Sequence, residues 1–244
     1  MNSPDPYRDT RVEVARGCRV LAARDLAPGI LGHISVRIDP DRIAIRCRHP
    51  EDRGLAFTQP EDVRIVYLDG TEGAEGELAH GHVPPYELPL HTSVYRRRAD
   101  VVCVTHAHPT DVVAADLAGI PLRPIVGAFD IPGATLARRG VPVYPRAVLV
   151  RDDRLGDEMA RCLGDKDVVV LRGHGLTSTG SSVPESVLRA ISVNTLARLS
   201  LSIVQAGGAL RDISDEDVAE LPDLGASLNH QTAWRHELAR LDAG

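Results

Sequence analysis

Hydrophobic and polar positions along the chain follow two spacings, one typical of helices and one typical of strands. Apolar residues recur at helical spacing from about Arg8 to Leu26, and Ala27-Pro28-Gly29 ends that pattern. Short apolar segments bounded by polar or turn residues then predict strands. These segments are Ile34–Ile38, Ile43–Cys47, Val63–Leu68, Val101–Val104 and Val168–Leu171. The last two are continuously apolar, which is typical of strands that are buried on both faces.

Helices are predicted between and after these strands. One begins after Pro84-Pro85 and continues to about Arg98, since proline suits the first turn of a helix. The others are predicted at Thr110–Leu117, at Arg154–Leu163, from Ser182 and Pro184 to Gly207-Gly208, and from about Ser227 to Leu241. Neither a repeat nor a linker divides the sequence. We therefore expect one α/β domain over residues 1–244, with a mainly β centre flanked by helices.

The composition excludes several classes of protein. With 244 residues, of which 43% are hydrophobic, the chain can bury one substantial core. A formal net charge of −6 without a basic stripe argues against binding nucleic acid. Continuous apolar runs stay far below the roughly 20 residues that span a bilayer, so no membrane partner is expected. The polar first residues lack the order of a signal peptide.

The four cysteines predict the cellular compartment. Cys18, Cys47, Cys103 and Cys162 lie far apart and form no Cys-x-x-Cys pair. This spacing is typical of buried, reduced thiols, and it favours a cytoplasmic protein.

Three histidines follow the two continuously apolar strands. His106 and His108 end the first one, and residues two apart in a strand point to the same side. His174 follows the second strand, between Gly173 and Gly175, which let the backbone turn sharply and approach an ion. Three imidazoles from two strand ends are typical of a catalytic zinc site with an open position. Manganese, cobalt or iron would also accept imidazole nitrogen.

Glu87 and His91 are four residues apart in a predicted helix, and this spacing would place them on one helix face. Two interpretations of Glu87 stay open at this point. Its carboxylate could cap the helix start, or it could face the metal as an acid/base or a fourth ligand.

Together these motifs resemble the class II aldolase/adducin family. The matching elements are Gly32-His33-Ile34-Ser35, Glu87-x-x-x-His91, His106-x-His108 and His174-Gly175, in the family's order and intervals. The resemblance implies a three-layer α/β/α domain with a mainly antiparallel or mixed central sheet. It also implies one divalent metal ion per subunit on His106, His108 and His174, with Glu87 as the catalytic residue. A homotetramer with active sites at the subunit interfaces is implied as well.

The sugar-phosphate members of that family hold phosphate through three elements that are altered in this chain. His33 stands where they have asparagine, and Thr58-Gln59-Pro60-Glu61-Asp62 replaces a glycine-containing turn. Pro85-Tyr86 replaces a pair of serines, so an N–H donor and the hydroxyls are lost. The segment after Pro121 also lacks the tyrosine of the aldolases. A sugar phosphate is therefore not the expected substrate.

Gly32-His33-Ile34-Ser35 and Pro84-Pro85-Tyr86-Glu87 instead look like the decarboxylases of the family. These act on hydroxylated aromatic or pyridine dicarboxylates such as dihydroxyphthalate. We therefore expect a metal-dependent, non-oxidative carboxy-lyase for a small-molecule substrate. An aldolase or dehydratase acting on an unphosphorylated substrate and a non-catalytic, adducin-like module are the alternatives. Candidate substrate contacts are His33, His82, His91 and Arg172, with Arg146 as a second possible cation for a carboxylate.

Overall fold

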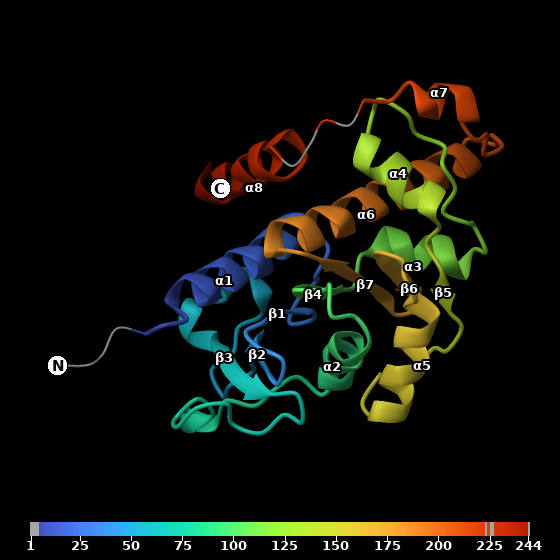
Figure 1. Ribbon diagram of the computed structural model, residues 1–244. Helices are drawn as coiled ribbons and strands as arrows, with labels where there is room; N and C mark the ends of the chain where they lie inside the picture. Colours follow the sequence, from blue (N-terminus) through green and yellow to red (C-terminus); the bar gives the residue numbers. More distant parts are fainter. Residues whose placement is uncertain (1–4, 223, 225–226, 244) are drawn as a thin grey trace.

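A seven-stranded mixed sheet lies at the centre of the computed structural model, which describes residues 5–222, 224 and 227–243 (Figure 1). The strands are β1 (His33–Arg37), β2 (Arg42–Arg46), β3 (Val63–Tyr67), β4 (Cys103–Ala107), β5 (Val143–Tyr144), β6 (Val168–Leu171) and β7 (Gly175–Gly180). Their order across the sheet is β3-β2-β1-β4-β7-β6-β5. Neighbouring strands are antiparallel except β5 and β6, which are parallel.

Helices cover both faces of this sheet. They are α1 (Arg8–Ala23), α2 (Leu88–Arg97), α3 (Thr110–Leu117), α4 (Ile131–Arg139), α5 (Asp153–Leu163), α6 (Val183–Gln205), α7 (Asp215–Ala219) and α8 (Ala233–Ala243), the last preceded by a π-helical turn (Ser227–Thr232). Short 3₁₀ turns occur at Leu55–Phe57, Pro60–Asp62 and Ala79–Gly81. Side chains of Asp130, Asp152, Ser182 and Ser214 accept hydrogen bonds from the first turns of α4, α5, α6 and α7, which satisfies backbone N–H groups that the helix itself leaves free.

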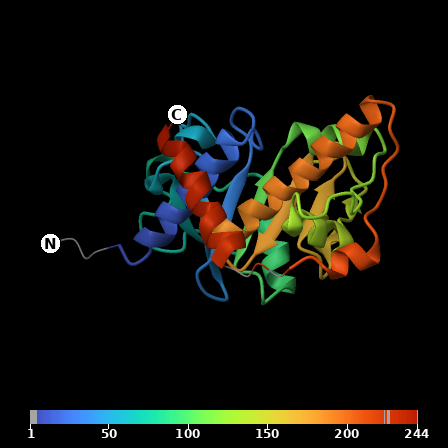
Figure 2. The same ribbon diagram turned by 90° about the horizontal axis from the view of Figure 1, so that it is seen from above.

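The alternation of side chains along the strands separates two hydrophobic cores. In β2, Ile43 and Ile45 pack with α2 and α5, whereas Ala44 packs on the opposite face with α1 and α6. Figure 2 shows α8 beside α1 and α6 on that second face, and Trp234 of α8 is buried in its core. The predicted fold class, a three-layer α/β/α arrangement around a mixed sheet, is confirmed.

Helix α6 is long and apolar enough in composition to cross a membrane. Its sequence nevertheless contains no uninterrupted apolar run, and Val187, Ala190 and Val193 are among its fully buried residues. It packs against β4, β7, α1, α3 and α4. We therefore interpret α6 as a core helix.

Most predicted elements occur within a few residues of their expected bounds. The predicted strand Val101–Val104 is displaced, since β4 begins at Cys103 and includes the polar residues Thr105 and His106. Strands β5 and β7 and helices α4 and α7 were not predicted. All four cysteines are free, as expected, although Cys162 is only half-buried.

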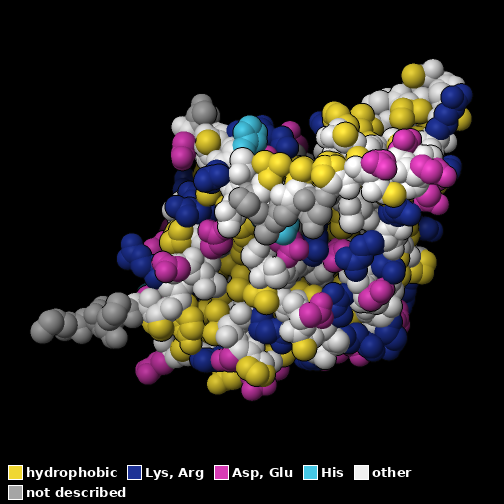
Figure 3. Space-filling view, turned by 45° about the horizontal axis from the view of Figure 1, so that its top comes forward, with side chains coloured by type: hydrophobic (Ala, Val, Ile, Leu, Met, Phe, Trp, Pro, Cys, Tyr) yellow, Lys and Arg dark blue, Asp and Glu magenta, His cyan; other side chains and the backbone are white. Residues whose placement is uncertain are grey.

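The face in Figure 3 carries lysine and arginine intermixed with aspartate and glutamate, and hydrophobic side chains lie between them. A mixed pattern of this kind does not create the extended positive potential that attracts nucleic acid. The absence of a nucleic-acid partner stays a prediction from composition.

Candidate metal centre

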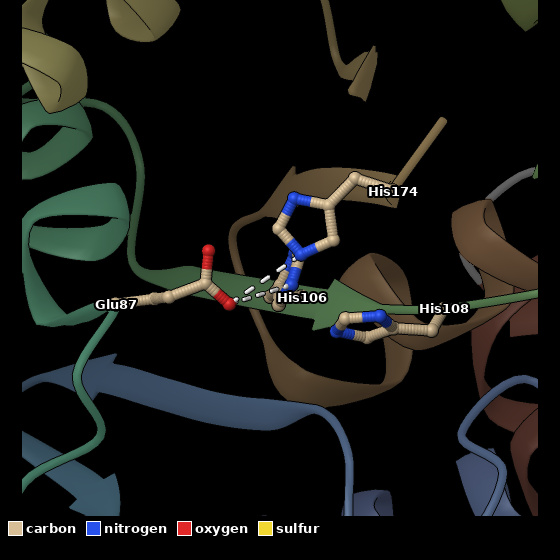
Figure 4. Close-up of side chains that lie close together, drawn as sticks. All are labelled: Glu87, His106, His108 and His174. Atoms are coloured by element: carbon tan, nitrogen blue, oxygen red, sulfur yellow. Dashed lines mark ion pairs between the residues drawn. The ribbon is translucent and has the colours of Figure 1, made fainter. Parts of the chain in front are cut away.

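Glu87, His106, His108 and His174 come together in the structure, although they are up to 87 positions apart in the sequence (Figure 4). One ligand atom of each residue can be chosen such that all four atoms lie within 4.8 Å of one another. The ring of His106 is 5.0 Å from that of His174, and the ring of His108 is 4.8 Å from the same ring. These side chains are therefore close enough to share one ion.

Strand geometry positions His106 and His108. His106 lies inside β4, and His108 follows immediately after its end, so both side chains lie on the side of the sheet that α2 covers. The backbone N–H of His108 donates to the carbonyl of Leu26, at 2.8 Å. This hydrogen bond ties the residue after β4 to the segment that follows α1.

The turn between β6 and β7 positions His174. Gly173 has a φ of +59°, a left-handed conformation that favours glycine, and its N–H donates to the carboxylate of Asp116 at 2.8 Å. Arg172 Nε donates to the same carboxylate at 3.2 Å. Asp116, from α3, thus holds the turn that carries His174.

Gly175 allows β7 to approach β4 closely. A Cβ atom at this position would lie 2.2 Å from the carbonyl oxygen of Ala107 and 3.1 Å from the Cα of His108. The sequence analysis assigned both flanking glycines to close approach of an ion. The structure gives Gly175 a different role, because its missing side chain makes room for the backbone of β4.

The hydrogen bonds of His106 indicate which nitrogen faces the centre. Nδ1 donates to the carbonyl of Leu176 at 3.0 Å, so Nε2 of the neutral ring has a lone pair. Nε2 is buried, has no hydrogen-bond partner among the described residues, and lies 3.3 Å from Glu87 Oε2. Two acceptors that face each other at this distance in a buried site repel unless a cation lies between them. The arrangement fits a divalent metal ion.

Glu87 occupies the N-cap position of α2, but its side chain does not cap the helix. Oε1 instead accepts a hydrogen bond from the backbone N–H of Val150 at 3.1 Å, while Oε2 faces the histidines, 3.5 Å from His174 Nε2. Of the two interpretations in the sequence analysis, capping is therefore wrong. The shared helix face with His91 is also wrong in detail, since Glu87 precedes the first helical residue.

Burial and the neighbouring rings set the charges in the centre. Burial by itself raises the pKa of Glu87, but the positive charge that the neighbouring imidazoles can carry, above all His106, outweighs it and holds that pKa well below its ordinary value. Burial, followed by the charges of His106 and His174, lowers the pKa of His108 to about 3. An ionised carboxylate and neutral imidazoles are the forms that bind a divalent cation.

His33 lies beside this centre on the neighbouring strand. It is paired directly with His106 across β1 and β4, and its Nε2 is 4.0 Å from Glu87 Oε2. His91 lies behind it, fully buried, with Nε2 2.6 Å from His33 Nδ1. Burial and the charge of His106 lower the pKa of His91 to about 3, so this ring is neutral.

Comparison with known proteins identifies the family. The model of the class II aldolase and adducin N-terminal domain matches residues 12–201. This chain is a member of that family. It is 61% identical over 241 residues to the 3,4-dihydroxyphthalate decarboxylase of Arthrobacter keyseri, covering 99% of this chain and 97% of the relative. Identity to the 3,4-dihydroxyphthalate decarboxylase of Rhodococcus jostii (strain RHA1) is 57% over 240 residues, covering 98% of both chains.

Solved structures agree with the fold. An aldolase II superfamily protein from Pseudomonas syringae superposes with a TM-score of 0.78, covering 98% of this chain and 95% of that one. The two sequences are 22% identical. The three-layer architecture is therefore that of the class II aldolase fold.

Two of the predicted substrate contacts of this class II aldolase family member are engaged elsewhere. His82 contacts Arg64, His49 and the carbonyl of Ala79. Arg172 is half-exposed and forms an ion pair with Asp116. The structure does not bring either side chain into contact with the four residues of the centre.

Arg146, the second candidate cation, also has its own partner. Its Nη1 donates to Glu158 at 2.8 Å, and Tyr144 donates to the same carboxylate. Arg146 and Arg172 were suggested by their positions in the sequence. Position in the sequence does not show that a carboxylate of the protein, Glu158 or Asp116, already pairs with each of them.

Sequence reasoning missed three groups that support the centre. The backbone N–H of Val150 holds Glu87, and nothing in the sequence indicates such a contact. Ser35 and Tyr95 continue the hydrogen bonds of His91 away from the site. Alternation in β1 was the available signal for Ser35, because residues 33 and 35 share a face of the sheet.

Proposed function

We propose that this chain is a non-oxidative decarboxylase that converts 3,4-dihydroxyphthalate to a dihydroxybenzoate and carbon dioxide. The observation that carries the proposal is the identity of 57–61% to three 3,4-dihydroxyphthalate decarboxylases over nearly the whole chain. The chemistry of the site agrees with it. Three imidazoles and one carboxylate converge at one point, and His33 lies beside them.

His106, His108 and His174 are the proposed ligands of a divalent ion, which is zinc, manganese, cobalt or iron, one per subunit. When bound, such an ion supplies Lewis-acid stabilisation of negative charge on the substrate. The buried Nε2 of His106, which has no hydrogen-bond partner among the residues described, supports this assignment. Imidazole and carboxylate donors suit all four of these metals.

Glu87 is the proposed proton carrier. The carbon–carbon bond to the departing carboxyl group breaks, its electron pair stays on the ring carbon, and a proton must replace the carbon dioxide. Oε1 of Glu87 is held by the N–H of Val150, whereas Oε2 faces the histidines, so Oε2 is positioned to relay a proton from solvent to the ring carbon. Proton transfer from a positioned side chain typically contributes about 10²–10⁴-fold in rate.

The carboxyl group beside the 3-hydroxyl is the one proposed to leave, because charge on that ring carbon is adjacent to the hydroxyl-bearing carbon. Loss of this group gives 3,4-dihydroxybenzoate, whereas loss of the other gives 2,3-dihydroxybenzoate. The test is incubation of the purified, metal-loaded enzyme with 3,4-dihydroxyphthalate in D₂O. We expect carbon dioxide and 3,4-dihydroxybenzoate with one deuterium on ring carbon 2. Absence of carbon dioxide, with aldehyde released from unphosphorylated hydroxy-ketoacids, would favour an aldolase instead.

A homotetramer with interfacial active sites and a cytoplasmic location complete the proposal. Large apolar side chains beside the centre are exposed in the single chain, namely Leu31, Tyr86 and Leu149. They lie next to His33, Glu87 and Val150 in the sequence, the last in the loop before α5, so burying them against another subunit would also close the site. Light scattering coupled to size-exclusion chromatography tests the tetramer. The four free cysteines support a reducing compartment.

A further inference from the structure

A line of hydrogen bonds leads away from the candidate metal centre through the side chains of His33, His91, Ser35 and Tyr95, here called the His33–Tyr95 chain. His33 Nδ1 is 2.6 Å from His91 Nε2, and His91 Nδ1 is 2.7 Å from Ser35 Oγ. Ser35 Oγ is 2.8 Å from the hydroxyl of Tyr95. All four side chains are buried. Each link therefore needs one hydrogen between its two atoms.

Tyr95 sets the direction of this chain. Its hydroxyl has a single hydrogen, and besides Ser35 Oγ its oxygen lies 3.0 Å from the carbonyl of Ser35 and 3.4 Å from the carbonyl of Val102. Carbonyl oxygens only accept hydrogen bonds. If Tyr95 donated to Ser35 Oγ, its oxygen would face both carbonyls with no hydrogen between them. Tyr95 therefore donates to the Ser35 carbonyl and accepts from the Ser35 hydroxyl.

The remaining links follow one after another. Ser35 gives its hydrogen to Tyr95, so Oγ must accept from an N–H at His91 Nδ1. A neutral imidazole has one N–H, and Nε2 of His91 is then an acceptor. His33 Nδ1 must supply the hydrogen of the last link. His33 Nε2 is thereby left without a hydrogen.

This Nε2 faces the reaction site. It lies 4.0 Å from Glu87 Oε2, which is beyond hydrogen-bond distance, and the ring of His33 is 5.0 Å from the ring of His106. A nitrogen lone pair attracts a hydroxyl group and repels a carboxylate oxygen.

We propose that the His33–Tyr95 chain fixes His33 as the Nδ1–H tautomer, so that Nε2 accepts a hydrogen bond from a ring hydroxyl of the substrate. His33 is then a catalytic-site residue, while His91, Ser35 and Tyr95 are positioning residues. The identity of the substrate rests on the proposed function. The assigned tautomer rests only on the hydrogen bonds of the His33–Tyr95 chain.

The first experiment reads the tautomer directly. In the zinc-loaded enzyme with ¹⁵N-labelled histidine, NMR distinguishes a ring N–H from an unprotonated ring nitrogen, and the signals missing from His33→Asn identify His33. We expect a hydrogen on Nδ1 and none on Nε2. A hydrogen on Nε2 in the wild-type enzyme would overturn the proposal, whatever the variants do.

Two tyrosine-to-phenylalanine variants test whether the His33–Tyr95 chain fixes the tautomer of His33. In Tyr95→Phe, the hydroxyl of Ser35 loses its acceptor and becomes free to donate to His91, which would reverse the chain and place the hydrogen on His33 Nε2. Tyr144→Phe is the matched control, because Tyr144 is also buried in the core on the α2 side and donates to Glu158 instead. We expect the His33 signals to change in Tyr95→Phe only. Unchanged signals in a folded Tyr95→Phe enzyme would refute the assignment of Tyr95 as the residue that fixes the tautomer.

Substrate analogues test what Nε2 contacts. Asparagine in His33→Asn can keep an N–H donor near the position of Nδ1 but has no atom at Nε2, so kcat/KM for 3,4-dihydroxyphthalate should fall at least about tenfold, the value of a typical hydrogen bond. Methylation of the contacted hydroxyl should cost the wild type at least tenfold more than it costs this variant. If methylation of each hydroxyl in turn lowers kcat/KM by the same factor in the wild type and in His33→Asn, the contact is contradicted.

The two proposals can fail separately. If 3,4-dihydroxyphthalate yields no carbon dioxide but His33 is the Nδ1–H tautomer, the proposed function is wrong and the tautomer assigned to His33 stands. If carbon dioxide is released but Nε2 bears the hydrogen, the decarboxylase stands and this inference is wrong.

Discussion

Gly175→Ala is the substitution whose effect on the metal centre can be estimated most directly from the structure. The new Cβ atom would lie 2.2 Å from the Ala107 carbonyl oxygen, whereas ordinary contacts of a Cβ atom begin at 3.4 Å. The obstructing atoms are backbone atoms of Ala107 and His108, so no flexible side chain can move away. Strands β4 and β7 must therefore separate locally by about 1 Å.

The consequence for metal binding follows from where this separation occurs. His108 is the next residue after Ala107, and His174 directly precedes Gly175, so both proposed ligands move apart. Ligand distances in metal sites vary by only about 0.2 Å, which is far less than the displacement. We expect metal affinity to fall at least about tenfold, turnover to fall with it, and overpacking to destabilise the fold by about 1–3 kcal/mol.

Gly127→Ala is the matched control for this prediction. A Cβ atom at Gly127 would meet only the Cδ1 of Ile213, at 3.8 Å, and this glycine does not have a left-handed conformation. Metal content by mass spectrometry, competition with a chelator, and urea unfolding are measured for both variants. If Gly175→Ala binds metal and turns over like the wild type, the close approach of β4 and β7 does not set the geometry of the centre.

Three further predictions concern individual side chains. Glu87→Gln should keep the hydrogen bond from Val150 and the fold, yet reduce turnover at least about a hundredfold; near-normal turnover would remove Glu87 from the mechanism. His174→Ala should lose bound metal and carbon dioxide release together, and full metal retention would exclude His174 as a ligand. Because the pKa of His91 is about 3 in the folded chain and 6.5 is the ordinary value, this ring contributes stability above pH 6.5 that is lost as the pH falls. Between pH 7.5 and 5.5, His91→Gln should therefore lose about 1.4 kcal/mol less unfolding free energy than the wild type in urea titrations, and equal losses would contradict the buried, neutral ring.

Elements with a strong periodic pattern were predictable, and elements defined by their neighbours were not. Thr110–Leu117 and Val168–Leu171 have the bounds that the sequence predicts, because apolar residues fill them and turn residues flank them. Strand β7 has one large apolar residue, Leu176, yet every residue in it is buried. Its hydroxyls are satisfied by tertiary contacts, as in the bond from Ser178 Oγ to the Ser186 carbonyl at 2.7 Å, and these contacts are invisible to a local pattern.

The extension of β4 beyond its predicted end has a related cause. Thr105 and His106 look like polar residues beyond a buried strand, although both are fully buried within it. Thr105 donates to or accepts from Ser186 at 2.7 Å, and His106 donates to Leu176. Polar residues extend a buried strand when each has a partner, and only the tertiary structure shows the partner.

The candidate metal centre could be anticipated because its proposed ligands are attached to predictable parts of the chain. His106 lies in β4 and His174 follows β6, and β7, which pairs with both strands, brings their ends together. Substrate contacts depend instead on long side chains, whose direction is decided by competing partners. Arg172 and Arg146 illustrate this, since Asp116 and Glu158 engage them.

His33 lies between these two cases, because the fold fixes its backbone while its neighbours decide what its ring can offer a substrate. Its backbone position is set by pairing with His106, so any residue at this position borders the reaction site. What that residue offers a substrate depends on the groups behind it, here His91, Ser35 and Tyr95. A histidine at position 33 without them would be free to present either a lone pair or an N–H. If the proposed tautomer holds, substrate choice in this chain depends on the buried residues behind the site as much as on the residues that touch the substrate.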